Sequence, residues 1–407
     1  MKSLAIFTAG ILLCLPMSGW SGIESPAPET KPDVVGDFIE FFILKHNIPG
    51  ASISITHNGQ VAYEKGVGVA NIETSSPVVS TTPFRIASVS KPITAVAIFK
   101  LLEDSGKDIQ AALDMPVFGA NGYLPDFAEI KDNDIYKIRL RDLLQHTGGW
   151  NSQFYDPQFD LYNIAVAMGT TPPADAPTVI RYMLKFRDLD VAPGTEYHYS
   201  NFGYNILGRV VEKLSGQPYD QYVRTHVLLP LGVDQMQIGG SRMEDLLPNE
   251  SRYYDDPRTP LVPSIYDGVT LGPQAYVGFS CATMDSHGGW IATPTELVKF
   301  INGVTPGSGS VQILKEDTIQ IMTAPVLGIG NDQTSLGWVV EENGAVIAHA
   351  GALESSTLSY LIRRSDGVTW AVTFNRLPIG TIDDIGPLMQ ELTSNMDLLI
   401  RSIDEWP

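Results

Sequence analysis

A serine stands three residues before a lysine where a long apolar helix is predicted to begin, in the stretch FRIASVSKPITAVAIF from Phe84 to Phe99. Pro92 suits the first turn of a helix, because no backbone N–H is needed there. Apolar residues with the spacing of a buried helix then follow at Ile93, Val96, Ala97 and Leu101. The fold must therefore enclose this helix, and the spacing places Ser88 and Lys91 on one face of it.

The same stretch suggests chemistry. A hydroxyl at the amino end of a helix, with an amine one turn away, has a neighbouring base and a field that favours negative charge. Both are properties of an activated nucleophile. The residues also fit a helix cap, Ser88, beside a solvated cation, Lys91, and such caps are common. The stretch alone leaves both interpretations open.

Composition limits the class of protein. The chain has 407 residues, of which 43% are hydrophobic and 18% charged, as in a soluble protein with a large core. That length permits two or three domains, or a single two-lobed enzyme. A net charge of −19 argues against nucleic acid or an anionic membrane as a partner.

Residues 1–21 have the pattern of a secretory signal peptide. Lys2 is its only charge, Leu4 to Leu15 is apolar, and small residues precede a cleavage point after Ser21. The apolar run is too short to span a bilayer comfortably, so we expect no stable membrane insertion. Residues 22–32, with three prolines, are predicted to be a flexible leader. The mature protein is therefore expected to be secreted or periplasmic.

Strand patterns concentrate at the two ends of the chain. A helix is predicted over 34–45, followed by a hairpin of strands 51–55 and 61–67 around an Asn-Gly turn. Further strands are predicted at 336–340, 345–349, 357–362 and 368–374, and a last helix at 387–403. The segment 103–280 shows helical patterns and loops with little strand signal. We therefore expect an α/β (α+β) fold, with one lobe from about 33–85 and 285–403 and a mostly helical lobe from about 86–284.

Several common sites have no motif in the sequence. There is no GxSxG elbow, no HExxH and no Cys/His set with zinc spacing, and Gly66-Val67-Gly68 lacks the third glycine of a dinucleotide loop. We therefore predict no metal and no cofactor.

Two later motifs bring further polar groups. Tyr199 and Asn201 lie in a polar turn, HYSNFGYNILG, that opens an apolar helix. His349, Ala350 and Gly351 close a strand, where glycine permits close approach of the backbone and histidine can transfer a proton. Each triplet alone is also compatible with a purely structural role.

Taken in order, these segments resemble the serine β-lactamase and penicillin-binding-protein superfamily, in its class C and serine-esterase branch. The resemblance extends over roughly 33–403, through the blocks TPFRIASVSKPITA, IRLRDLLQHTGG, APGTEYHYSNFGYNILGRVVEKLSGQPYDQYV, LLPLGV, GGWIATPTELVKFING, LGW and HAGALESS. It implies a β-lactamase/transpeptidase-like fold, in which helices flank an antiparallel sheet beside a mostly helical lobe.

The resemblance also implies roles. Ser88 would be the acylated nucleophile, Lys91 its proton acceptor, and Tyr199 a second base that serves the leaving group and the deacylating water. Asn201 would bind the substrate carbonyl or Lys91.

The predicted positions on a late strand, His349, Gly351 and Ala352, would bind the substrate. The backbone N–H groups of Ser88 and of Ala352, just past Gly351, would form an oxyanion hole.

His146 is expected to brace the helical lobe beside the site. The aromatic residues Trp150, Tyr155 and Trp338 fit either the acyl pocket or core packing.

The residue type at position 349 gives information about the substrate. Members of the superfamily that bind a carboxylate usually carry lysine there, whereas a histidine resembles the esterases, D-amino-acid peptidases and transesterases of the branch. We expect an exported serine hydrolase that cleaves an ester or amide of a small-molecule or peptide-like acyl group. The alternatives are a β-lactamase or DD-peptidase, an acyltransferase that uses a small alcohol, and a binding protein without turnover. The sequence leaves the oligomeric state open.

Overall fold

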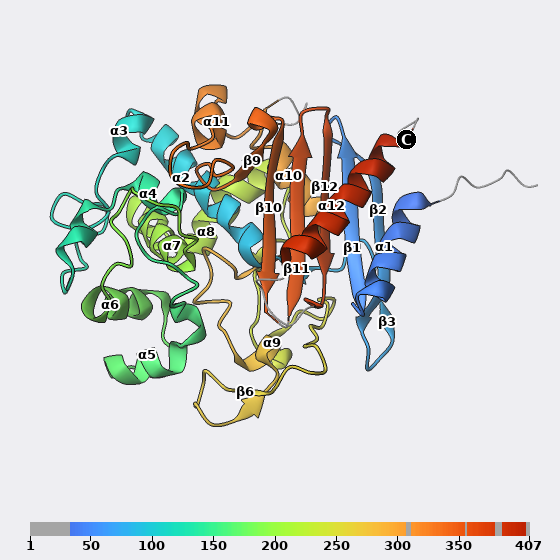
Figure 1. The fold of residues 1–407 in the computed structure, drawn as a ribbon, viewed down its shortest axis with the longest axis horizontal. Helices are drawn as coiled ribbons and strands as arrows, with labels where there is room; N and C mark the ends of the chain where they lie inside the picture. The colour runs from blue at the N-terminus through green and yellow to red at the C-terminus, as the bar shows by residue number, and fades with distance from the viewer. Residues whose placement is uncertain (1–32, 307–310, 355, 379–384, 404–407) are drawn as a thin grey trace, which may run out of the picture.

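A seven-stranded sheet joins the two ends of the chain (Figure 1). The structure, a computed structural model, describes residues 33–306, 311–354, 356–378 and 385–403, so the predicted signal peptide and leader lie outside it. All neighbouring strands are antiparallel. Across the sheet they run β3 (Ser76–Pro77), β2 (Gln60–Asn71), β1 (Gly50–His57), β12 (Val368–Phe374), β11 (Thr357–Arg364), β10 (Val346–Leu353) and β9 (Val339–Glu341).

The predicted hairpin is present as β1 and β2. Asn58 and Gly59 form its turn with φ of 50° and 78°, the positive values that a two-residue hairpin turn requires. Strand β1 is buried on both faces and pairs on its other edge with β12, where Ile53 lies opposite Val372. The first described strand therefore lies inside the sheet, next to its middle strand β12.

Helices cover both faces of the sheet. Helices α1 (Val34–Lys45) and α12 (Ile385–Arg401) cross one face together, and α10 (Pro294–Asn302) packs against β1, β11 and β12 (Figure 1). The core beneath α1 and α12 includes Phe42, Trp370 and Leu392. This arrangement confirms the predicted antiparallel sheet with flanking helices.

The middle of the chain is mostly helical and surrounds α2. Its helices are α2 (Ser90–Asp104), α3 (Ile109–Leu113), α4 (Leu140–Leu144), α5 (Leu161–Met168), α6 (Ala176–Phe186), α7 (Asn201–Ser215), α8 (Tyr219–Val223), α9 (Gln274–Val277) and α11 (Glu316–Thr323). Helix α2 contacts α3, α7, α8 and α11, and eleven of its fifteen residues are buried. It is therefore enclosed rather than amphipathic.

Short strands also occur where the sequence showed little strand signal. The ladders are β4 (Phe84–Arg85), β8 (Trp290–Ala292) and β5 (Gln237–Ile238) in one sheet, and β6 (Val262–Pro263) with β7 (Leu271–Gly272) in another. Most have two residues, which is too few for an alternating pattern to be recognised. Within the described residues, no helix combines the length and apolarity needed to cross a membrane.

Candidate active site

Ser88 lies in a single 3₁₀ turn, Ala87–Val89, between β4 and α2. This turn directly precedes helix α2, which begins at Ser90, so Ser88 lies before the helix and not within it. Ala87 has a φ of 46°, a left-handed conformation that costs a non-glycine residue about 1–3 kcal/mol. Pairing of β4 with β8 and a hydrogen bond from Ile86 N to Trp290 O (3.0 Å) hold the turn in place. Such local strain is typical of a functional position.

The Lys91 amine is directed at Ser88. Its Nζ donates to Ser88 Oγ at 2.9 Å, to Asn201 Oδ1 at 2.6 Å and to the backbone carbonyl of His287 at 3.1 Å. The side chain is 0% exposed, and this burial lowers the pKa of Lys91 to about 7, against a smaller opposing effect of the Asp156 charge. At neutral pH a large fraction of this amine is unprotonated and can accept a proton.

Tyr199 approaches Ser88 from the helical side. Its hydroxyl donates to Ser88 Oγ at 2.8 Å, and Lys91 Nζ lies 4.7 Å from the centre of its ring. Burial raises the pKa of Tyr199 above its usual range, so the resting phenol is protonated. Ser88 Oγ therefore lies between the Lys91 amine and the Tyr199 hydroxyl.

His146 supports Tyr199. The two rings stack with centroids 4.5 Å apart, and His146 Nδ1 accepts the backbone N–H of Ser200 at 3.1 Å. Burial holds the pKa of His146 well below its usual value, so the ring is neutral. The position beside the site agrees with the bracing role expected for His146.

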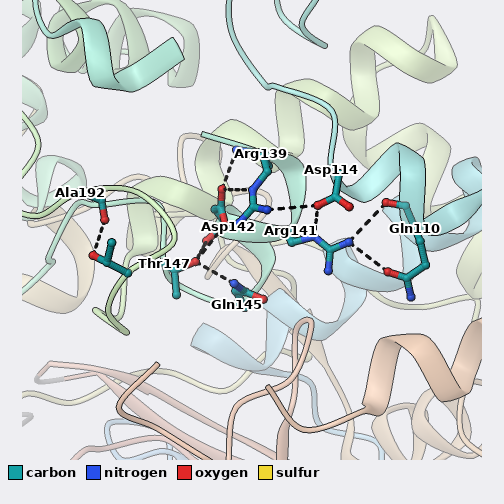
Figure 2. Close-up of polar contacts among 9 residues, drawn as sticks. Gln110, Asp114, Arg139, Arg141, Asp142, Gln145, Thr147 and Ala192 are labelled. Carbon is teal, nitrogen blue, oxygen red and sulfur yellow. Dashed lines mark hydrogen bonds and ion pairs between the residues drawn. The ribbon is translucent and has the colours of Figure 1, made fainter. Parts of the chain in front are cut away.

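A polar network fixes the turn that carries His146 (Figure 2). Asp142 accepts hydrogen bonds from the Arg139 guanidinium at 3.0 and 2.9 Å and from the Arg139 backbone at 2.8 Å. Thr147 donates to the Asp142 backbone and accepts from Gln145 at 2.9 Å, while Arg139 and Arg141 share Asp114. These contacts join α4 to the residue after His146 and so limit the movement of the ring.

Asn201 is the first residue of α7 and is held at three points. Its backbone N–H donates to Ser152 Oγ at 3.0 Å, and its Oδ1 accepts from Lys91. Its Nδ2 donates to Asp156 Oδ2 at 2.7 Å. The predicted contact of Asn201 with Lys91 is therefore present, and it continues to a carboxylate that the sequence analysis did not identify.

Strand β10 closes the opposite side of the site. A Cβ on Gly351 would lie 2.2 Å from Ile86 O and 3.0 Å from Ser88 N, so the backbone of β10 touches the turn that carries Ser88. His349 Nδ1 lies 2.6 Å from the Ala350 carbonyl, and burial lowers the pKa of His349 to about 3. His349 is therefore neutral at physiological pH.

These residues surround a cavity of about 810 Å³. Of the seven predicted site residues, five line it, namely Ser88, Tyr199, Asn201, His349 and Ala352, while Lys91 and Gly351 contact Ser88 from behind. Among the aromatic candidates, Trp338 lines the cavity. Trp150 instead packs against Phe202, and Tyr155 donates to Asp160.

The charges around the cavity are unequal. Among the described lining residues there are two carboxylates, Asp156 and Glu354, and no lysine or arginine. The three histidines of the lining, at 146, 287 and 349, all have a pKa lowered by burial. The cavity wall thus offers no permanent cation to a substrate within the described residues.

Sequence reasoning missed Asp156 and His287. Asp156 belongs to a polar loop that directly follows the block containing His146, and that adjacency was the available signal. His287 contributes a backbone carbonyl to Lys91, and any residue type has such a group. Its role could not be read from the sequence.

Sequence comparison identifies related proteins. The Beta-lactamase family profile matches residues 29–388. Protein flp of Staphylococcus aureus (strain MW2) is 28% identical over 197 residues, and the match covers 48% of this chain but only 36% of that protein. Esterase EstB of Burkholderia gladioli is 26% identical over 333 residues, with 77% of this chain and 81% of the esterase covered.

Solved structures share the fold. The octameric penicillin-binding protein homologue from Pyrococcus abyssi superimposes with a TM-score of 0.65 at 24% identity, over 90% of this chain and 78% of that one. A D-amino acid amidase from Ochrobactrum anthropi SV3 superimposes with a TM-score of 0.66 at 19% identity, over 89% of this chain and 98% of that one. With a family profile that matches most of its length, the chain belongs to the β-lactamase family of serine hydrolases.

Proposed function

We propose that this protein is an exported serine hydrolase that cleaves an ester or amide through an acyl-enzyme on Ser88. One observation carries the proposal: Ser88 Oγ lies 2.9 Å from the Lys91 amine and 2.8 Å from the Tyr199 hydroxyl. A hydroxyl becomes a nucleophile when a positioned base takes its proton. The lowered pKa of Lys91, about 7, supports that role.

In the acylation half, Ser88 Oγ attacks the substrate carbonyl and its proton moves to neutral Lys91. The tetrahedral oxyanion accepts hydrogen bonds from the backbone N–H groups of Ser88 and Ala352. One donor of this kind typically contributes about 10²–10³ in rate. Tyr199 gives its proton to the leaving group as the bond to the acyl carbon breaks, and the Lys91 ammonium stabilises the phenolate that remains.

Deacylation reverses these transfers. Water attacks the acyl carbon and gives a proton to the Tyr199 phenolate. As the ester bond to Ser88 breaks, Lys91 returns its proton to Ser88 Oγ. Both residues end in their starting protonation states, so the cycle is balanced without a cofactor.

The cavity lining favours substrates without a carboxylate. Its described residues include Asp156 and Glu354 but no lysine or arginine, and His349 is neutral. A substrate anion would meet like charge and no partner. This supports neutral or ammonium-bearing esters and amides over penicillins and D-Ala-D-Ala peptides. The names of the related esterase and D-amino acid amidase point to the same chemistry.

A substrate panel tests the proposal. Purified protein and Ser88→Ala are compared on p-nitrophenyl esters, D-aminoacyl anilides and nitrocefin, and are treated with a serine-directed fluorophosphonate. We expect labelling and turnover of a neutral or ammonium substrate, both abolished in Ser88→Ala. Turnover that survives in Ser88→Ala would refute the mechanism. Turnover of nitrocefin alone would indicate a β-lactamase, ester formation with added alcohols a transesterase, and silence with every substrate a binding protein.

A further inference from the structure

The polar contacts of Ser88 do not end at Lys91. They continue from Lys91 Nζ to Asn201 Oδ1 (2.6 Å) and from Asn201 Nδ2 to Asp156 Oδ2 (2.7 Å). The other Asp156 oxygen accepts from the Gln158 side chain. A buried carboxylate is thus joined to the nucleophile through one amide and one amine.

The chemistry of the two neighbours fixes the orientation of the Asn201 amide. A lysine amine next to an acceptor donates, so it requires the amide oxygen, and an ionised carboxylate only accepts, so it requires the amide NH₂. With Asp156 in place, a flipped amide would turn its oxygen toward the ionised carboxylate. Two acceptors cannot share a hydrogen bond, so the contact between Asn201 and Asp156 would be lost. Asp156 therefore holds Asn201 in the one orientation that receives Lys91.

Among the described residues, Asp156 is also the carboxyl group whose charge raises the pKa of Lys91. The other titratable groups facing Lys91 are neutral phenols and imidazoles, namely Tyr199, Tyr204, His146, His287 and His349. Those facing Asp156 are Lys91 and Tyr199. Burial raises the pKa of Asp156 to about 6, so it is largely ionised at neutral pH. Its charge then favours the ammonium form of Lys91.

We propose that Asp156 is a positioning residue of this active site, which acts through Asn201 to orient Lys91 and to set the pH at which Lys91 accepts the proton of Ser88. The proposal rests on the acyl-enzyme mechanism above. It adds Asp156, from the loop before α5, to the side chains of Lys91, Tyr199 and Asn201. Without the carboxylate, Lys91 would be less firmly oriented and would be a weaker base.

The test is the pH dependence of kcat/KM with a neutral p-nitrophenyl ester, whose own charge does not change. Asp156→Asn removes the charge and can still accept from Asn201. Because the lost carboxylate stabilised the ammonium, we expect the acid limb of the Asp156→Asn profile to move to lower pH by about one unit. A merely structural role would lower kcat/KM by the same factor at every pH.

Asp160→Asn is the matched control. Asp160 lies four residues further on, where it accepts from Tyr155 and Asn163, and it has no contact with Asn201. The acid limb of the Asp160→Asn profile is expected to coincide with that of the native protein. Should Asp156→Asn fail to give a cooperative thermal transition, Asp156→Ser removes the charge with a smaller side chain and is expected to show the same shift.

Two outcomes separate the claims. An active Asp156→Asn or Asp156→Ser with an unshifted acid limb, alongside an inactive Ser88→Ala, overturns the role of Asp156 and leaves the mechanism intact. An active Ser88→Ala overturns the mechanism itself. An acid limb that moves to lower pH in the Asp156 variants, but not in Asp160→Asn, supports the proposal.

Discussion

Ser88 contacts Lys91, whose pKa is lowered by burial to about 7, and Tyr199, which burial keeps protonated. Below the pKa of Lys91, about 7, the ammonium cannot take the serine proton. We therefore expect kcat/KM for a neutral ester to rise with pH with a midpoint near 7, and to stay high to about pH 9 because Tyr199 remains protonated.

A stopped assay over a pH series measures this profile. Lys91→Arg, whose guanidinium stays charged throughout, serves as the control and is expected to be inactive at every pH. An acid limb near pH 4, the ordinary range of a carboxyl group, would assign the base to another residue.

His349 is the second residue with a testable charge. It is neutral in the cavity, so His349→Lys would add a cation there. A hydrogen bond to a charged group is worth about 1.5–3 kcal/mol, and we therefore expect at least about a tenfold gain for a carboxylate-bearing ester relative to its neutral analogue. His349→Gln, which stays neutral, should leave the ratio of the two kcat/KM values unchanged. An unchanged ratio in His349→Lys would show that position 349 does not contact that part of the substrate.

At the residue scale, the sequence singled out residues that the structure brings together around Ser88, because each stands in a recognisable pattern. Ser88 and Lys91 are three residues apart at a helix start, and Tyr199 and Asn201 begin another helix. Asp156 has no such pattern. Its importance comes from packing against α7, a contact between positions 45 residues apart.

Strand β10 approaches the turn of Ser88 closely at Gly351. A methyl group on Gly351 would meet Ile86 O at 2.2 Å and Ser88 N at 3.0 Å, which are both backbone atoms. We expect Gly351→Ala to displace Ser88 and to lower kcat/KM by about 10² or more, as a shift of about 1 Å can do.

Gly386→Ala is the matched control, since among the described residues no atom beyond its chain neighbours and its own helix backbone lies within 4 Å of the methyl group that it adds. It should keep full activity. A fully active Gly351→Ala would show that β10 can move away without disturbing Ser88.

Helix α12 allows one substitution to be compared at two positions. Leu392 is 0% exposed against the sheet, whereas Leu398 is 69% exposed on the same helix. An unpaired buried charge costs several kcal/mol, so Leu392→Asp should greatly lower the melting temperature or the soluble yield. Leu398→Asp should change the free energy of unfolding by less than about 0.5 kcal/mol. Equal effects at both positions would contradict the packing of α12 described above.

Long helices and strands could be predicted from the sequence, whereas very short strands could not. Helix α1 begins and ends where the apolar spacing placed it, and the Asn-Gly pair located the hairpin of β1 and β2. The described part of the last helix runs from Ile385 to Arg401 and includes the predicted start at Pro387. The ladders of β4, β5 and β8 have only two or three residues each, and they form because the tertiary fold brings them together.

The whole molecule carries a net charge of −19, and its first 21 residues are predicted to direct export. We expect intact-mass analysis of the protein released from a bacterial host to show a chain that starts at Gly22. A charged residue in the apolar run, as in Leu12→Arg, should block this processing and retain the protein in the cell. Release of a chain that still carries Met1 would contradict the signal assignment.

At this scale the sequence indicated that strands gather at the two ends of the chain, because the alternating patterns occur there. It did not indicate which strands are neighbours. The pairing of β1 with β12 depends on the helical residues between them folding so that Ile53 meets Val372.

That pairing also sets an order of folding. Strand β1 is synthesised long before its partner β12. Until β12 arrives, the β1–β2 hairpin has an open edge, and an isolated hairpin is only marginally stable in water. Contacts between distant positions form slowly. The seven-stranded sheet therefore cannot close until β12 and the helical residues that precede it have been synthesised.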